Sequence, residues 1–304
     1  MKNKTVFLFI YGLGCNTAFN AMALSDPNIL DKIEEVLTFL KQQKDRKFKI
    51  GNKVYTLHNV RILQERIKSL NYRNIAYILL LELRDKYISQ ILNDLYLLHY
   101  CSLYNIPENI DTVHVLCDPS LKNQVEKIGT YFCNVNRYSR LRSSMNLRDN
   151  NYYEESLNTI LSYLKNKTYT NIIVIGYSYG GAIVSKVAKF LNNSNIPRTE
   201  LSKLQMATVG SIYIPPKFKT KNIKLYHYVF KNDPAYTTCS RITDISAYPN
   251  LFILPSTNDS FNENDPYLKL MNDKNRSAHA KYNKIITSIV EKKNTKIDIS
   301  KIEV

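Results

Sequence analysis

The stretch that most constrains the fold runs from Asn171 to Leu191. Four apolar residues, Ile-Ile-Val-Ile at 172–175, lead into Gly-Tyr-Ser-Tyr-Gly-Gly at 176–181, and an amphipathic segment follows. This order predicts a strand, a sharp turn and a helix, with the pattern G-x-S-x-G across the turn. The turn requires small residues two positions before and after the serine, because larger side chains would collide with the neighbouring backbone. We interpret Ser178 as a nucleophile exposed above the sheet, with helical N–H groups close by.

Two other interpretations of this motif have to be weighed. The pattern also fits an ordinary tight turn between a strand and a helix, or a phosphate-binding loop. A phosphate-binding loop would require a Lys directly after the glycine and then Ser or Thr, but the residue directly after Gly181 is Ala182. The whole chain contains only 8 glycines, so a chance G-x-S-x-G between an apolar strand and a helix is improbable. The nucleophile interpretation is therefore preferred.

Apolar segments alternate with amphipathic ones along most of the chain. We expect strands at 5–11, 111–117, 171–175, 204–214, 223–230 and 251–254, and helices at 27–40, 121–128, 152–165, 182–191 and after 282. Such alternation predicts a three-layer α/β fold with a mostly parallel sheet. Since no internal repeat or long linker divides the sequence, residues 1–304 are expected to form a single domain.

An insertion of about residues 50–108 follows the first strand and its helix. Its second half, 71–104, is rich in Leu, Ile and Tyr and predicts one long or two shorter helices. The apolar run at 75–83 is interrupted by Glu82 and Arg84, too early for a membrane span. The insertion could be an added packing layer or a lid over the site. Packing is preferred, because an apolar helical stripe usually faces a core.

The N-terminus allows two interpretations. Lys2 and Lys4, an apolar run and Ala-Met-Ala at 21–23 imitate a secretory signal peptide. Residues 5–14 also read as a buried strand ending in a glycine turn, and no other stretch before residue 110 supplies such a strand. We favour the strand, and hence a cytoplasmic protein, with secretion as the alternative. The five cysteines are odd in number and lack a C-x-x-C pair, as in reduced thiols in a reducing compartment.

The formal net charge of +16 bears on possible partners. It would suit nucleic acid or an anionic membrane surface, or it could be unspecific. The lysines are scattered, and no helix-turn-helix, zinc or RNA-binding motif accompanies them, so nucleic acid is not favoured. An anionic membrane surface stays open as a partner. No cofactor and no metal ion is expected.

A serine nucleophile needs a base, and the base needs an acid that holds its tautomer. In a parallel sheet of this kind they follow in chain order Ser, acid, His, from the carboxyl ends of successive strands. Two histidines follow Ser178: His227 lies within an expected strand and His279 lies in a loop. His279 is therefore the expected base. His114 lies inside another strand and is expected to be a core or surface histidine of the sheet.

The expected acid is Asp233, which follows the strand at 223–230 and precedes Pro234. Four other aspartates between Ser178 and His279 lie in loops and rank behind it: Asp244, Asp259, Asp265 and Asp273. A purely turn-forming Asp-Pro is the alternative for Asp233. The oxyanion hole should use the backbone N–H of Tyr179 and a second N–H from the glycine turn at 12–14, that of Leu13.

Four motifs together resemble the α/β-hydrolase superfamily, and within it the class 3 lipases. They are Gly-Tyr-Ser-Tyr-Gly-Gly-Ala at 176–182, Val-Gly-Ser at 209–211, Asn-Asp-Pro-Ala at 232–235, and His279 with Tyr282 three residues on. The resemblance covers about residues 150–285, with a weaker match at 5–14. It departs from the family at Tyr177, where His is usual, and at Tyr11-Gly12, which replaces the common His-Gly.

The resemblance implies a serine esterase that acts on acylglycerols or phospholipids, without a cofactor and often with a lid. We therefore expect a serine hydrolase that cleaves lipid acyl esters through an acyl-enzyme. Lipase, phospholipase, thioesterase and acyltransferase activities all stay open. The alternative is a non-catalytic protein of the same fold that binds a lipid surface or a protein partner through its basic face. The complete set of Ser178, Asp233 and His279 favours the enzyme.

Overall fold

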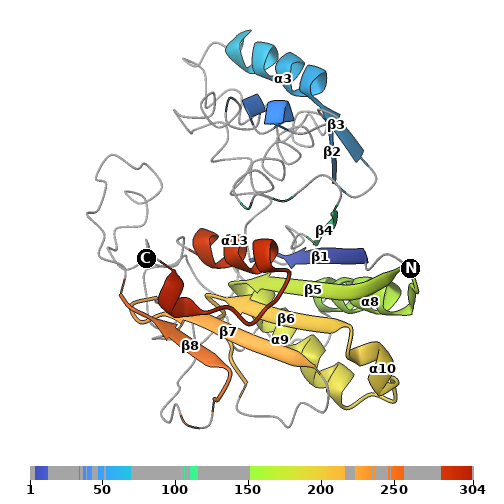
Figure 1. Ribbon diagram of the computed structural model, residues 1–304, viewed down its shortest axis with the longest axis vertical. Coiled ribbons are helices and arrows are strands. Elements are labelled where there is room, and N and C mark those ends of the chain that lie inside the picture. The colour runs from blue at the N-terminus through green and yellow to red at the C-terminus, as the bar shows by residue number, and fades with distance from the viewer. Residues whose placement is uncertain are drawn as a thin grey trace.

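The structure is a computed structural model (Figure 1). It describes residues 4–12, 34, 37–38, 40–42, 47–50, 53–69, 104, 106, 110–115, 151–215, 223–233, 236, 246, 248–256 and 282–302. Among them, no helix has both the length and the apolar character that crossing a membrane requires.

Six strands form one sheet in which every neighbouring pair is parallel (Figure 1). In spatial order they are β4 (Asp111–Val115), β1 (Lys4–Ile10), β5 (Tyr169–Tyr177), β6 (Leu204–Val209), β7 (Lys224–Phe230) and β8 (Leu251–Leu254). Parallel strands need crossovers, and helices usually make them. The expectation of an α/β fold with a mostly parallel sheet is confirmed.

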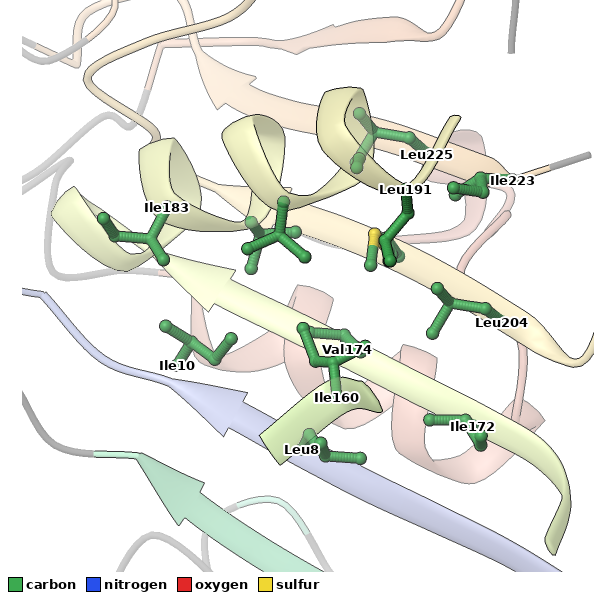
Figure 2. Close-up of a cluster of buried hydrophobic side chains, with 14 of the residues drawn as sticks. Leu8, Ile10, Ile160, Ile172, Val174, Ile183, Leu191, Leu204, Ile223 and Leu225 are labelled. Carbon is green, nitrogen blue, oxygen red and sulfur yellow. The ribbon is translucent and has the colours of Figure 1, made fainter. Parts of the chain in front are cut away.

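Helices cover both faces of this sheet. The helices α8 (Asn151–Lys165) and α9 (Tyr179–Asn192) pack on one face, where apolar side chains of β1, β5 and β6 meet them (Figure 2). The helix α13 (Asn283–Lys292) packs on the other face, with Leu37 and Leu40 in the same cluster. Strand residues alternate between the two clusters, as the two-residue period of a strand requires.

The first strand lies inside the sheet, between β4 and β5. Its residues Val6 to Ile10 are at most 2% exposed, and Phe7 and Phe9 face the α13 side. The continuous apolar run is typical of a parallel strand buried on both faces. The prediction of a structural strand at the N-terminus is therefore confirmed for Lys4–Ile10.

A short antiparallel hairpin, and the helix that follows it, were not expected from the sequence. Strand β2 (Lys47–Ile50) pairs with β3 (Lys53–Thr56), and α3 (Leu57–Ser69) follows (Figure 1). The signal was present: Gly-Asn at 51–52 separates two runs of alternating polar and apolar residues. Apart from Tyr104, the segments 71–104 and 121–128, where helices were expected, lie outside the described residues.

The remaining boundaries agree with the sequence, with one clear exception. Strand β6 ends at Val209, whereas the apolar run predicted a strand up to Ile214. Gly210 has a φ of 56°, a left-handed conformation that turns the chain out of the sheet. Two short elements were not expected, α10 (Arg198–Leu201) and η4 (Ile299–Lys301).

Candidate active site

Ser178 occupies an unusual backbone conformation between β5 and α9. Its φ is 55° and its ψ is −118°, and among the described non-glycine residues only Lys293 also has a positive φ. Such conformations cost about 1–3 kcal/mol and persist only where the surrounding structure imposes them. Here the N–H of Ser178 donates to the carbonyl of Val209 (3.0 Å), and its own carbonyl accepts from the N–H of Gly181 (3.0 Å).

The glycines around Ser178 are required by close contacts. A Cβ on Gly176 would lie 2.7 Å from the carbonyl oxygen of Gly180, and one on Gly180 would lie 2.6 Å from the carbonyl carbon of Ile10. A Cβ on Gly12, just after β1, would lie 2.8 Å from the Cβ of Ser178. The end of β1 is therefore pressed against the serine turn, and a side chain at Gly12 or Gly180 would separate them, whereas one at Gly176 would separate β5 from the start of α9.

The order of the strands places this contact at a topological switch point of the sheet. The chain continues from β1 to β4 on one side, and from β5 to β6 on the other. Helix α9, which follows β5, lies on one face, and Leu37 and Leu40, which follow β1, pack on the opposite face. The strand order thus reverses between β1 and β5, and parallel α/β sheets bind their ligands outside the strands' carboxyl ends at such a point. Gly12 and Ser178 lie at these two ends.

Tyr179 is the first residue of α9, directly after Ser178. The first N–H groups of a helix point out of its N-terminal end, where the helix dipole is positive. The side chain of Tyr179 is fully buried and stacks on Tyr152 with 6.4 Å between ring centroids, which fixes the start of the helix. The expected second oxyanion donor, Leu13, lies outside the described residues.

Asp233 is the third residue after the end of β7, directly after a turn at Lys231 and Asn232, and its side chain is fully buried. Its N–H donates to the carbonyl of Phe230 (3.0 Å), and its carbonyl accepts from the N–H of Tyr236 (3.0 Å). The carboxylate oxygen Oδ2 accepts a hydrogen bond from the hydroxyl of Tyr282 (2.6 Å). A buried carboxylate needs such donors, because burial without them is costly.

Tyr282 precedes α13 and is 1% exposed. Besides Asp233, its hydroxyl contacts the backbone N–H of Phe230, which donates to it (2.9 Å). Burial, the charge of Asp233 and the hydrogen bond to it together hold the pKa of Tyr282 well above its ordinary value of 10.0. In the sequence, Tyr282 is recognisable only as part of the motif that contains His279. Its spacing of three residues from His279 was the signal that could have connected it to the site.

The expected base, His279, lies outside the described residues. His227 lies within β7, as expected, and is 5% exposed, with its Nδ1 2.7 Å from the Thr208 hydroxyl. Burial lowers the pKa of His227 to about 3. His114 lies in β4, where its Nδ1 is 2.8 Å from the hydroxyl of Tyr11 and its ring stacks on Phe9. Burial lowers the pKa of His114 to about 3 as well, so both histidines are neutral members of the sheet.

The buried His227 should make the fold sensitive to acid. The pKa of His227 is about 3 in the folded protein, against the ordinary value of 6.5 that applies in the unfolded chain. Between these two values, the imidazole of His227 is protonated only in the unfolded state. Stability is then lost as the pH falls below 6.5, by about 2 kcal/mol at pH 5. We expect the stability difference between the wild type and His227→Asn, measured by urea unfolding, to narrow by about that amount from pH 7 to pH 5. If this stability difference were the same at pH 7 and pH 5, His227 would not be buried in its neutral form.

No family model, curated protein or solved structure matches this chain. Within the described part of the chain, no group of His, Cys, Asp and Glu residues is arranged to hold a metal ion. The functional interpretation therefore depends on the geometry around Ser178 and Asp233.

Proposed function

We propose that this protein is a serine hydrolase of the α/β-hydrolase type that cleaves carboxylic esters, with Ser178 as its nucleophile. The observation that carries the proposal is the backbone of Ser178, with φ 55° and ψ −118° in a turn closed by glycines. A turn with only a structural role would favour glycine at this position, because glycine adopts a positive φ without strain. A serine there is explained by a requirement for its hydroxyl.

The order of the strands supports the proposed assignments. β1 lies on one side of β5, and β6, β7 and β8 lie on the other. Asp233 follows β7 and His279 follows β8, which is the chain order Ser, acid, His of α/β-hydrolases. In that fold the second oxyanion donor comes from a loop after a strand beside the nucleophile strand. Leu13, which follows β1 and Gly12, meets this description.

His279 is proposed as the base from its place in the chain. It precedes Tyr282 by three residues, and three residues of extended chain span at most about 11 Å. The hydroxyl of Tyr282 is hydrogen-bonded to Asp233, and the ring of Tyr282 contacts Tyr177, which precedes Ser178. Tyr282 itself contacts both groups, so this short tether to Tyr282 supports His279 as the base. His227, in the middle of β7, has Thr208 as its partner instead.

Each proposed residue has one role in the reaction. His279 accepts the proton of the Ser178 hydroxyl while the serine oxygen attacks the ester carbonyl carbon. The N–H groups of Tyr179 and Leu13 stabilise the oxyanion of the tetrahedral intermediate, and Asp233 orients His279 and stabilises its charged form. The alcohol leaves with the proton from His279, and water then cleaves the acyl-enzyme by the same steps. No cofactor enters this reaction.

The proposed substrates are lipid acyl esters. This part of the proposal is supported by the resemblance to class 3 lipases, and the net charge of +16 would favour an anionic lipid surface. Lipase, phospholipase, thioesterase and acyltransferase activities could all proceed through the same kind of acyl-enzyme, so each stays open. We also propose a cytoplasmic location, since Lys4–Ile10 forms an interior strand of the sheet.

Hydrolysis of p-nitrophenyl esters of increasing chain length, together with an acyl thioester, tests the function. Ser178→Ala should lose at least about a thousandfold in rate, because no nucleophile remains. Ser185→Ala is the matched control: Ser185 is a buried serine of α9 whose hydroxyl donates to the carbonyl of Gly181 (3.0 Å). It should stay within about threefold of the wild type. A wild type that is inactive on every ester would favour the non-catalytic alternative.

His279→Ala is expected to lose nearly as much activity as Ser178→Ala. The double variant should be no worse than either single one, because the members of a triad act as a unit. His227→Ala should instead lower the stability, since it removes a buried side chain bonded to Thr208. The measurements are ester hydrolysis and urea unfolding of all four proteins. Normal turnover in His279→Ala, with a folded but inactive His227→Ala, would reverse the assignment.

A further inference from the structure

Tyr282 connects the end of β7 with the serine turn. Its ring packs against Phe230 with 4.7 Å between centroids and meets Tyr177 edge-on at 6.4 Å. Its hydroxyl lies 2.6 Å from Oδ2 of Asp233. The same side chain therefore contacts the residue before the proposed nucleophile and the carboxylate of the proposed acid.

The direction of the hydrogen bond to Asp233 follows from the second partner of the Tyr282 hydroxyl. The backbone N–H of Phe230 can only donate, and it donates to the Tyr282 oxygen at 2.9 Å. The single hydroxyl proton is thus directed at Asp233, and a carboxylate oxygen accepts it. The pKa of Tyr282, raised by its burial and by Asp233, keeps this proton in place through the neutral pH range.

This arrangement fixes the rotation of the Asp233 carboxylate. Its backbone is held by the carbonyl of Phe230 and the N–H of Tyr236, and the hydroxyl of Tyr282 holds Oδ2. With the backbone and one oxygen held, the direction in which Oδ1 accepts a hydrogen bond is also set. An acid that orients a catalytic imidazole depends on this direction, because errors of about 1 Å in a site can cost about a hundredfold in rate.

We propose that Tyr282 is a positioning residue that aligns Asp233 with the base, and through Tyr177 keeps this pair in register with Ser178. The inference rests on the proposed function, because it requires a triad to align. Tyr282 does not touch the reacting atoms in this account. Its hydroxyl acts on the base through Asp233.

The test is Tyr282→Phe, which keeps the ring and removes only the hydroxyl. We expect kcat for p-nitrophenyl butyrate to fall about 10- to 100-fold, with KM within about twofold of the wild type, because alignment and not substrate binding is lost. In an Asp233→Asn background the same change should cost less than about twofold, since the partner through which Tyr282 acts is already removed.

Tyr228→Phe is the matched control. Tyr228 is also fully buried in β7, and its hydroxyl likewise donates to one group, the carbonyl of Thr295 (2.7 Å), and accepts from another, the N–H of Ile297 (3.0 Å). Both partners are backbone groups of the C-terminal segment. Tyr228→Phe should therefore lower the melting temperature by about as much as Tyr282→Phe and leave kcat within about twofold of the wild type.

Each outcome decides between the two proposals. A wild type without ester hydrolysis, or an undiminished Ser178→Ala, overturns the proposed function and the positioning role with it. An active, Ser178-dependent wild type with normal kcat in Tyr282→Phe overturns the positioning role alone. If Tyr282→Phe cost as much activity in the Asp233→Asn background as in the wild type, Tyr282 would act independently of the acid, and the positioning role would again be overturned. A Tyr282→Phe protein that fails to fold while Tyr228→Phe folds would overturn it too, because the role of the hydroxyl would then be structural.

Discussion

Ser178→Gly is expected to stabilise the fold while it abolishes ester hydrolysis. The serine has a φ of 55°, and relief of this strain is worth about 1–3 kcal/mol, from which the flexibility of glycine subtracts about 0.5–1 kcal/mol. We therefore expect a net gain of about 1 kcal/mol in the free energy of unfolding, measured by urea titration. Hydrolysis should fall at least about a thousandfold, because the attacking oxygen is lost.

Two further variants separate strain from chemistry. Ser178→Ala also lacks the oxygen but keeps the Cβ and hence the strain, so it should be inactive without the gain in stability. Lys293→Gly changes the other described non-glycine residue with a positive φ, 48°, after the end of α13. It should raise stability by up to about 1 kcal/mol and leave hydrolysis unchanged. If Ser178→Gly were less stable than Ser178→Ala, the strain would have no part in the account.

Among the substitutions proposed for this protein, Gly180→Ala is expected to cause the largest loss in the free energy of unfolding. The new Cβ would lie 2.6 Å from the carbonyl carbon of Ile10 and 2.6 Å from the carbonyl oxygen of Tyr11. Both atoms belong to the backbone of an interior strand or its end, so no side-chain rotation makes room. The loss should be at least about 3 kcal/mol, measured from the urea midpoint of unfolding.

Gly181→Ala is the matched comparison for this collision. Its Cβ would meet the side chain of Ser211, with Cβ at 2.8 Å and Oγ at 3.0 Å, rather than the backbone of β1. Adding Ser211→Gly should recover part of the stability lost by Gly181→Ala, whereas it should not help Gly180→Ala. A Gly180→Ala protein with the unfolding midpoint of the wild type would show that β1 and α9 are not in this close contact.

The turn around Ser178 could be predicted from the sequence because its signals are local. Apolar residues lead into glycines and then into an amphipathic segment, and β5 and α9 follow this pattern. The position of Asp233 after β7 was predictable for the same reason, since an apolar run ends at a turn-forming Asp-Pro. Both assignments needed only neighbouring residues.

Features that depend on contacts between distant segments could not be predicted in this way. The apolar run 204–214 did not decide that the strand ends at Val209, because an isolated glycine in such a run fits a bulge as well as an end, and the N–H of Gly210 donates to the carbonyl of Tyr228 in β7 (3.0 Å). The hydrogen bond between Tyr282 and Asp233 joins residues that are 49 positions apart in the sequence. The contact of Gly12 with Ser178 depends on β1 lying beside β5, which the order of residues along the chain does not state.

The most direct test of the central claim is to locate the residue that a fluorophosphonate modifies. Such reagents react with a serine only when a base activates it and an oxyanion hole stabilises the adduct. Wild-type protein is treated at neutral pH, digested and analysed by mass spectrometry. The account predicts one adduct, on Ser178, which is absent from Ser178→Ala and present in Ser185→Ala. No adduct on the folded wild type, or an adduct on another residue that persists in Ser178→Ala, would contradict it.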